Sequence, residues 1–220
     1  MFNDISDYMG ICEVLQMNNP WEDINLEDYE KHMSLDSVFQ LQTMNQMMKE
    51  QFYKYSIKSI MILGIASGNG LEHIDNQVID KVYGIDINEN YLKACKNRYS
   101  ELEGILETLC VDLTQDIKLP CADLLVANLL IEYIGYEYFQ NAVKKVNPKY
   151  VSCIIQVNTN DSFVSDSPYL HVFDRLDEIL HPVEESGLVE AMRNINYKKD
   201  DLQERKLPNG KKFVRIDFTR

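Results

Sequence analysis

The segment 64–70 carries the clearest chemical pattern in this sequence, because small residues are concentrated there directly after an apolar run. These small residues are Gly64, Ala66, Ser67, Gly68 and Gly70. The apolar run over 59–63 predicts a buried strand, so the small residues fall in a turn at its carboxyl end. Glycine permits a tight turn and lets a ligand approach the backbone closely. The alternative is an ordinary glycine-rich turn, and the segment alone does not separate the two.

An acidic residue follows at a spacing that favours the binding interpretation. Asp86 ends the next apolar run, 16 residues after Gly70, and is followed by Ile87 and Asn88. Nucleotide-binding sheets place a carboxylate in this range on the ribose hydroxyls, and a carboxylate is able to accept hydrogen bonds from both hydroxyls of a diol. The alternative is a solvated acid at a strand end. Together with the glycine-rich turn, the spacing predicts a ribose-binding carboxylate.

Two further polar positions follow predicted strands. Asp112 and Leu113 come directly after the third apolar run, where a carboxylate is able to accept a hydrogen bond from the exocyclic amine of adenine; a surface turn is the alternative. Asn128 and Leu129 stand at the end of the fourth run. Ligands of open α/β sheets bind outside the carboxyl ends of the strands, where all four features fall. Their joint placement predicts one binding site.

The elements that position these residues alternate between strands and helices. The apolar runs predict strands over 59–63, 82–86, 106–111, 123–128 and 150–157. One helix carries Tyr91, Leu92 and Cys95 on its inner side, and another is predicted over 138–146 and ends at Pro148. Such alternation implies a parallel sheet with right-handed crossovers.

The two ends of the chain have different patterns. After an Asn-Gly turn at 208–210, three apolar residues alternate with Arg215 and Asp217, which predicts a half-exposed strand in an antiparallel hairpin. Near the N-terminus, helical spacing occurs over 5–17, and residues 18–21 have the composition of a loop. A second helix is predicted from Ser34, whose hydroxyl is a suitable cap. Its apolar face is Val38, Leu41, Met44, Met48 and Phe52.

The composition argues against several classes of protein. The net charge is −13, with 22 basic and 35 acidic residues and no basic cluster, which disfavours a nucleic-acid partner or an anionic membrane surface. The N-terminus lacks a signal-peptide pattern, and no apolar run approaches the roughly 20 residues that span a bilayer. The five cysteines form no CxxC pair, so neither a disulfide framework nor a metal site is expected. We therefore expect a cytoplasmic protein.

These motifs resemble those of the class I S-adenosylmethionine-dependent methyltransferases, over roughly residues 30 to 220. The segment 62–70 looks like the first motif of the family, Asp86 like its ribose-binding acid and Asp112 like the residue near adenine. Asn128 and the residues after it look like the segment that meets the methionine part and the acceptor. The resemblance implies a doubly wound α/β fold with a mostly parallel seven-stranded sheet, an antiparallel C-terminal hairpin and N-terminal helices. It also implies S-adenosylmethionine as the cofactor and S-adenosylhomocysteine as the product.

The sequence departs from the family at three points. An acidic residue usually stands where this chain has Gly64, and a glycine often stands where it has Ala66. Losing the acid removes a polar contact to the amino-acid end of the cofactor, whereas alanine still permits close approach. The Asn-Pro-Pro-Tyr type of motif found in amino-group DNA methylases is absent after Asn128, which argues against that substrate class.

The resemblance implies in-line methyl transfer to a small-molecule acceptor. We expect residues 1–57 to form a helical lid or cap, residues 58–220 to form the core domain, and the chain to be a monomer or a homodimer. The candidate catalytic residues are Glu132 and Tyr133, which follow the fourth strand, and His32 in the lid region. The aromatic candidates for an apolar acceptor pocket are Trp21, Tyr133, Tyr136, Tyr138, Phe163 and Tyr169.

Two alternatives remain open. One is a protein on the same fold that binds the cofactor or a partner without catalysis, because a fold does not fix a function. The other is a nicotinamide-dinucleotide oxidoreductase, for which a Gly-x-Gly-x-x-Gly pattern is expected. Here Gly68-Asn69-Gly70 is followed by Leu71, Glu72 and His73, so the third glycine is missing.

Overall fold

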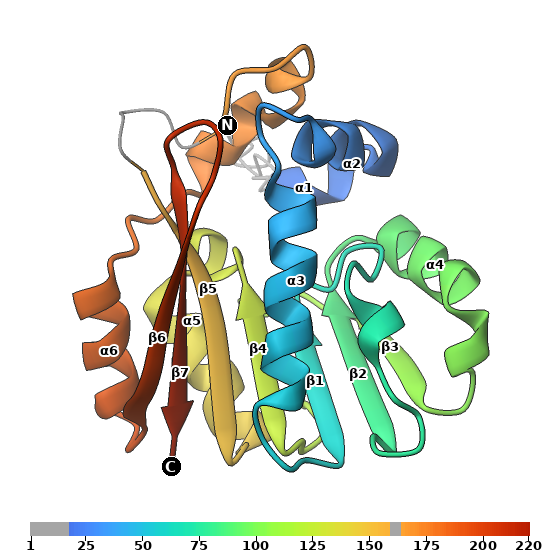
Figure 1. Cartoon of the computed structure of the whole chain (residues 1–220), viewed down its shortest axis with the longest axis vertical. Coiled ribbons are helices and arrows are strands. Elements are labelled where there is room, and N and C mark those ends of the chain that lie inside the picture. Colours follow the sequence, from blue (N-terminus) through green and yellow to red (C-terminus); the bar gives the residue numbers. More distant parts are fainter. Residues whose placement is uncertain (1–17, 159–163) are drawn as a thin grey trace, which may run out of the picture.

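The computed structural model describes residues 18–158 and 164–220, so the helix predicted over 5–17 and the aromatic candidate Phe163 lie outside the described residues. Seven strands form one sheet in the order β3-β2-β1-β4-β5-β7-β6 (Figure 1). The strands are β1 (Ser59–Leu63), β2 (Lys81–Asp86), β3 (Leu106–Cys110), β4 (Leu124–Asn128), β5 (Tyr150–Val157), β6 (Lys198–Lys206) and β7 (Lys212–Thr219).

The five neighbouring strands β3, β2, β1, β4 and β5 pair in parallel. Strand β7 pairs antiparallel with both β5 and β6. The predicted doubly wound sheet with an antiparallel terminal hairpin is therefore confirmed. The predicted bounds of β1 and β5 agree with the structure. The other three predicted strands differ from it by one residue at one end, which is the ordinary uncertainty of strand boundaries.

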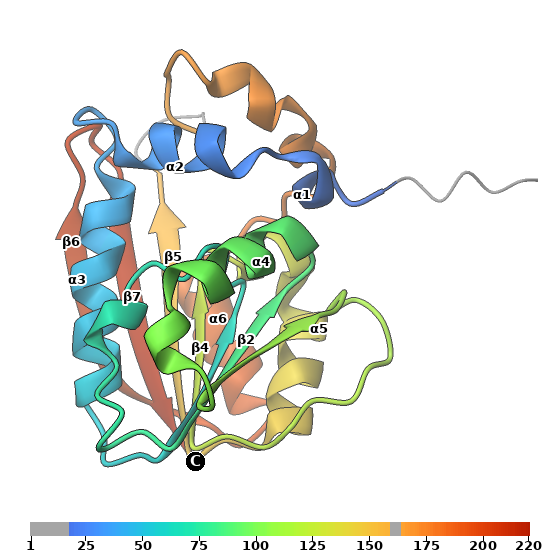
Figure 2. The same cartoon turned by 90° about the vertical axis from the view of Figure 1, so that its right-hand side faces the viewer.

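Helices cover both faces of the sheet and its carboxyl edge. The longer ones are α2 (Leu26–Ser34), α3 (Gln40–Tyr53), α4 (Glu89–Arg98), α5 (Ile131–Val146) and α6 (Glu185–Arg193); the short ones are α1 (Pro20–Asp23) and the 3₁₀ segments η1 (Leu71–His73), η2 (Ser100–Leu102) and η3 (Leu170–Glu178). Helices α3 and α4 pack on one face, and α5 and α6 pack on the other. Helices α1 and α2 and segment η3 lie above the carboxyl ends of the parallel strands (Figure 2). We call these three elements the cap.

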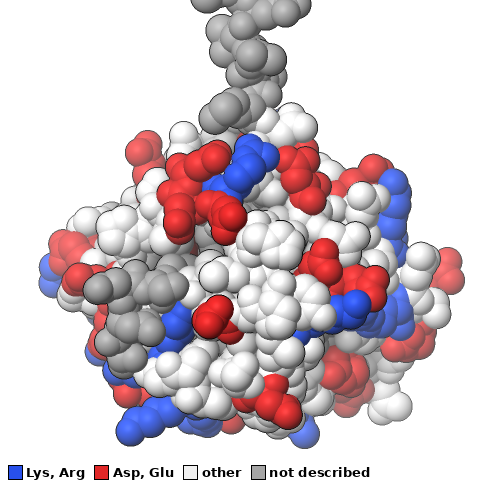
Figure 3. Space-filling model, turned by 90° about the horizontal axis from the view of Figure 1, so that it is seen from above, with Lys and Arg blue, Asp and Glu red and all other residues white. Residues whose placement is uncertain are grey.

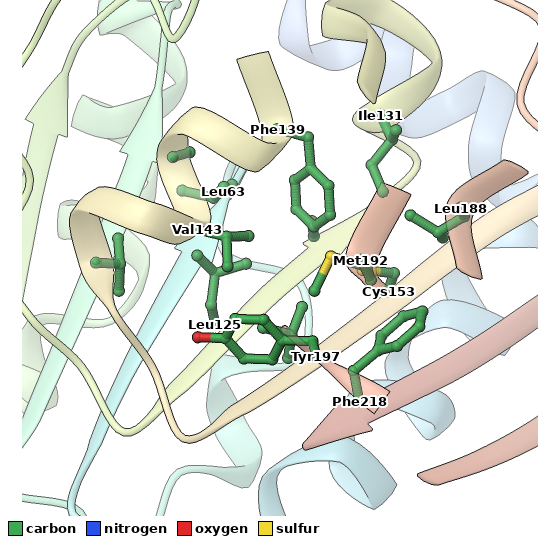
Figure 4. Close-up of a cluster of buried hydrophobic side chains, with 14 of the residues drawn as sticks. Leu63, Leu125, Ile131, Phe139, Val143, Cys153, Leu188, Met192, Tyr197 and Phe218 are labelled. Carbon is green, nitrogen blue, oxygen red and sulfur yellow. The ribbon is translucent and has the colours of Figure 1, made fainter. Parts of the chain in front are cut away.

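The core has one apolar cluster on each face of the sheet. On the α5 side, Phe139 and Val143 pack with Met192 of α6 against strand residues such as Leu125 and Cys153 (Figure 4). On the other face, methionines of α3 and side chains of α4 pack against β1, β2 and β4. Because both faces are covered, the central strands are buried almost throughout, as their continuous apolar runs predicted.

The predicted N-terminal boundaries were wrong, and the predicted apolar face was only partly right, because Val38 lies before the helix and Leu41 is half-buried. Residues 18–21 are not all loop, because Asn19 caps α1 and Pro20 occupies its first turn. Ser34 does not cap a helix: it ends α2, and its hydroxyl donates to the carbonyl of Lys31. The next helix begins only at Gln40. The buried residues on that helix still include Met44, Met48 and Phe52.

Helix α5 begins seven residues before the predicted start at Tyr138. Its first turn is separated from the rest by Gly135, which has a φ of 74° and interrupts the regular backbone. The helical spacing in the sequence therefore becomes regular only after this kink. As a result, the first turn places Glu132 and Tyr133 beside the strand ends.

Strand β7 is buried on both faces, which contradicts the predicted half-exposed strand. Arg215 and Asp217 are each 1% exposed, because α3 covers the face on which they lie. The Arg215 guanidinium contacts the Asp217 carboxylate at 3.0 Å, and Lys54, the residue directly after α3, contacts the same carboxylate at 2.9 Å. Arg215 also contacts Glu50 of α3 at 3.2 Å. These ion pairs thus offset the cost of burying the charged residues of this strand.

We predict that Arg215→Met lowers the free energy of unfolding by about 3 kcal/mol or more, because it leaves the buried Asp217 carboxylate without its guanidinium partner. The matched control is Arg205→Met, which also removes a contact to Glu50 but from a side chain that is 43% exposed. That change is expected to cost less than about 1 kcal/mol. Urea unfolding of both variants measures the difference, and equal losses would contradict the buried network.

Candidate functional site

A pocket lies at the carboxyl ends of the parallel strands, beneath the cap. The predicted cofactor-binding residues that line it are Gly64, Ala66, Ser67, Asp86, Ile87, Asp112, Leu113, Asn128 and Leu129. The predicted catalytic residues His32 and Tyr133 also line it. Four predicted residues lie outside the lining: Gly68, Gly70, Asn88 and Glu132. The structure therefore brings the ends of β1 to β4 together around one cavity.

The turn after β1 adopts a left-handed backbone at two positions in the pocket wall. Gly64 has a φ of 71° and Ala66 a φ of 49°. A Cβ at Gly64 would lie 3.3 Å from Cδ1 of Leu130, in a conformation that L side chains rarely adopt. The acid that the family usually has at this position would be strained in this backbone. The departure at Gly64 thus has a geometric explanation.

The other two glycines of the motif make room for neighbouring side chains. A Cβ at Gly68 would lie 2.7 Å from the Tyr99 ring, and one at Gly70 would lie 3.0 Å from Cβ of Met48. Both have a φ of 89°. The packing of α3 and α4 against the turn accounts for these two glycines without a ligand.

The Asp86 carboxylate is held by backbone groups on either side of the pocket. One oxygen accepts the N–H of Ala66 at 2.8 Å, and the other accepts the N–H of Asn88 at 2.9 Å. Burial raises the pKa of Asp86, while these hydrogen bonds oppose the rise. Each oxygen retains a second lone pair, so the carboxylate is oriented and still able to accept from a diol.

Asn88 and Asp112 stabilise turns beside the pocket. The Asn88 side chain caps α4 and donates to the carbonyl of Trp21 at 2.9 Å, so it joins the cap to the sheet. Asp112 accepts both the N–H and the hydroxyl of Thr114, at 2.9 and 2.7 Å. This geometry fixes the direction of the Asp112 carboxylate at the β3 end of the pocket.

Asn128 forms a reciprocal amide pair with Gln51 of α3. The two side chains exchange hydrogen bonds of 3.0 Å in both directions, and Gln51 also donates to Ser152 at 2.8 Å. Ser152 in turn donates to Asp217. The floor of the pocket is therefore connected to the buried charge network of β7.

Aromatic side chains cluster within the cap, and polar contacts join the cap to the turn after β1. Trp21 contacts Tyr133 edge-on, with ring centroids 5.0 Å apart, and Phe173 of η3 belongs to the same cluster. Glu30 of α2 pairs with Arg98 of α4 at 2.7 Å and accepts the hydroxyl of Ser67. The cap thus contacts both the turn after β1 and helix α4.

Among the other aromatic candidates, Tyr169 packs in the cap cluster, whereas Tyr136 and Tyr138 lie away from the pocket. The Tyr136 hydroxyl donates to the carbonyl of Glu184, and Tyr138 is an exposed side chain. The pocket also contains Gln40, Gln156 and Ser165, which the sequence analysis did not identify. No local pattern marked them.

The three catalytic candidates have different environments. His32 is 3% exposed, its Nδ1 lies 2.7 Å from the Ser167 hydroxyl, and burial together with the charge of Lys211 lowers its pKa to about 4. Burial raises the pKa of Tyr133 well above its ordinary value. Glu132 lies behind β5: one oxygen accepts the N–H of Gln156 at 2.9 Å, the other has no partner among the described residues, and burial raises its pKa to about 7.

A pocket at the carboxyl edge of a sheet with this strand order and an antiparallel terminal hairpin defines the class I methyltransferase fold. The family model described as a methyltransferase domain matches residues 62–148, which include the turn after β1, Asp86, Asp112 and Asn128. Over these residues the chain is similar to the methyltransferase domain, and the described structure as a whole has the class I methyltransferase fold. Comparison with curated protein sequences gives no match.

Solved structures share this fold at low sequence identity. The N-methyltransferase NodS from Bradyrhizobium japonicum WM9, in complex with S-adenosyl-L-homocysteine, has a TM-score of 0.63 and 10% identity over 89% of this chain and 97% of that chain. Magnesium protoporphyrin IX methyltransferase (ChlM) from Synechocystis PCC 6803, with bound SAM, has a TM-score of 0.59 and 10% identity over 92% and 88%. The [4+2]-cyclase SpnF has a TM-score of 0.61 and 10% identity over 81% and 80%.

Two features are absent from residues 18–158 and 164–220. No group of three or more His, Cys, Asp or Glu side chains is placed to hold a metal ion. No helix in these ranges is long and apolar enough to cross a membrane.

We predict that Ala66→Gly raises the free energy of unfolding by about 0.5–1 kcal/mol, because glycine relieves the left-handed strain more than it adds unfolded-state entropy. Ala94→Gly, in the regular helix α4, is the control and is expected to lower it by about 1 kcal/mol. Urea unfolding compares the two. A loss of stability in Ala66→Gly would contradict the interpretation that the Ala66 backbone is strained.

We predict that His32 stays neutral down to about pH 5. Its folded pKa is below the value of about 6.5 in an unfolded chain. Its contribution to stability is therefore present above about pH 6.5 and is lost as the pH falls through about 4. An NMR titration of the His32 ring measures the pKa, and His32→Gln should weaken the acid dependence of unfolding. A midpoint near 6.5 in the folded protein would contradict this environment.

Proposed function

We propose that this chain binds S-adenosylmethionine in the pocket and catalyses methyl transfer to a small-molecule acceptor. The single observation that supports this most strongly is the oriented Asp86 carboxylate beside the turn after β1. Asp112 at the next strand end extends the same wall of the pocket. The match of residues 62–148 to a methyltransferase domain is consistent with this ligand.

The residues present fit the cofactor in three parts. Asp86 would hold the ribose hydroxyls, and Asp112 with Leu113 would hold the adenine. The backbone at 64–66 and Leu129 would hold the methionine part, where Gly64 leaves the wall without a side chain. When bound, S-adenosylmethionine supplies a methyl group activated by a positively charged sulfur.

The contribution of the protein is positioning and exclusion of water. The aromatic cluster of the cap covers the pocket, and fixed polar groups surround it. Holding two reactants in line contributes roughly 7–11 kcal/mol to lowering a barrier. His32 is the pocket residue best placed to take a proton. Its low pKa makes it a weak base, which is sufficient for an acceptor group that becomes strongly acidic once methylated.

Glu132 and Tyr133 have supporting roles in this proposal. Glu132 holds the backbone of Gln156 from behind β5, and the Tyr133 ring forms part of the cap contact with Trp21. Within the region 1–57, α1 and α2 would act as the lid, whereas α3 packs on the sheet as part of the core.

A small molecule is the acceptor that best suits this pocket. The lining is mostly apolar with a few polar groups, which is typical of small-molecule sites. Acidic side chains lie across the outer face of the cap (Figure 3). The exposed acids of the cap elements are Glu22, Asp23, Glu27, Asp174, Asp177 and Glu178. They would repel the phosphates of a nucleic acid.

We predict that the protein binds S-adenosylhomocysteine and S-adenosylmethionine at micromolar strength in calorimetric titrations. Asp86→Ala should weaken binding about 100-fold, since it removes two hydrogen bonds to a charged group, each worth about 1.5 kcal/mol. Asp80→Ala, just before the opposite end of β2, is the control and should leave the affinity unchanged.

NADH serves as the competing ligand in the same titrations. Binding of NADH in place of the adenosyl compounds would favour the oxidoreductase alternative. Binding of the adenosyl compounds without methyl turnover on any acceptor would favour a non-catalytic binding protein.

A further inference from the structure

The pocket reaches one strand beyond the residues assigned to the cofactor. Those residues follow β1, β2, β3 and β4, whereas Gln156 lies near the end of β5 and also lines the pocket. Neighbouring strands are about 4.8 Å apart, so the end of β5 lies roughly 10 Å from the end of β1. This part of the pocket, which we call the β5 end, is where an acceptor has room.

Two buried side chains of the α2–α3 region bring polar atoms to the pocket. Gln40, the first residue of α3, is 5% exposed, and its amide nitrogen donates to the side-chain oxygen of Gln156. The Gln40 oxygen has no hydrogen-bond partner among the described residues. His32, in the last turn of α2, is 3% exposed and uses Nδ1 toward Ser167, which leaves Nε2 without a described partner.

The cap side chains beside His32 are apolar. The His32 ring lies 4.7 Å from the Phe173 ring, and Phe173 packs with Leu176 in the cap cluster. Both of these cap residues line the pocket, as does Val164. Neither atom is among the fully buried unpaired atoms of the described residues, so both remain accessible to a ligand atom, and a hydrogen bond made beside these apolar groups is strengthened.

We propose that Gln40 and His32 form the recognition pair of the acceptor site, and that they bind an uncharged hydroxyl or amine on an otherwise apolar small molecule. This inference rests on the proposed function for the identity of the site. The Gln40 oxygen can only accept, so the acceptor must present an O–H or N–H to it. The neutral His32 ring, with Nδ1 engaged by Ser167, meets the same group through Nε2.

A set of aromatic probes of similar size tests this assignment on the full chain. Benzyl alcohol carries a hydroxyl and aniline an uncharged amine. Benzylamine is cationic, benzoate is anionic, and toluene has no polar group. Their dissociation constants are measured by NMR titration at pH 7.5, with and without S-adenosylhomocysteine. We expect benzyl alcohol or aniline to bind about tenfold more tightly than toluene and than the two charged probes, the increment of about one hydrogen bond in an apolar site.

The Gln40→Leu variant should lose this tenfold preference and keep the affinity for toluene. The matched control is Gln46→Leu on the same helix, whose side chain is exposed. It should bind all five probes as the unmodified protein does. Unchanged affinity of Gln40→Leu for S-adenosylhomocysteine and toluene shows that the variant is folded.

The outcomes separate the acceptor class from the proposed function. A preference for benzyl alcohol assigns a hydroxyl acceptor, and a preference for aniline assigns an amine. Tightest binding of benzoate or benzylamine overturns the proposal, as does a preference that Gln40→Leu retains or an absence of binding by both uncharged polar probes. Failure to bind S-adenosylhomocysteine while the probe preference holds would instead count against the cofactor.

Discussion

The site depends on one carboxylate and on the hydrogen bonds that it accepts from two backbone N–H groups. Asp86 fixes the turn after β1 through Ala66 and the start of α4 through Asn88, so three segments meet at one side chain. Each of these amides is a backbone donor that needs a partner, and the Asp86 carboxylate supplies it. Asp86 is therefore a structural residue in this fold, in addition to the binding role that we propose for it.

The cap is joined to the sheet by polar contacts made beside the pocket. Glu30 meets Arg98 and Ser67, and Asn88 holds the carbonyl of Trp21. Two stretches that are more than 100 residues apart, α1–α2 and η3, combine in this cap. The contacts that hold the cap in place are thus made by the turns that line the pocket. In the proposed function, docking of the cap and binding of the cofactor are therefore energetically coupled.

Much of the sheet was predictable because buried parallel strands are continuous apolar runs, and many of the residues that line the pocket fall where those runs end. The rest depends on which element packs against which. Arg215 and Asp217 alternate with apolar residues as a half-exposed strand does, yet α3 and the residue directly after it supply their ion partners. Ser34 has the chemistry of a cap but ends a helix. Gln40 and Gln156 carry no local signal, since only the tertiary fold places a glutamine at a helix start over the end of β5.

The amide pair between Gln51 and Asn128 has a consequence for how this sequence is able to change. Each side chain satisfies the donor and the acceptor of the other, so replacing either one alone leaves a buried amide unpaired, at a cost of about 1–3 kcal/mol. Replacing both by apolar residues of matching shape avoids that cost. Among homologues, positions 51 and 128 should therefore vary together or remain as they are, although they are 77 residues apart along the chain.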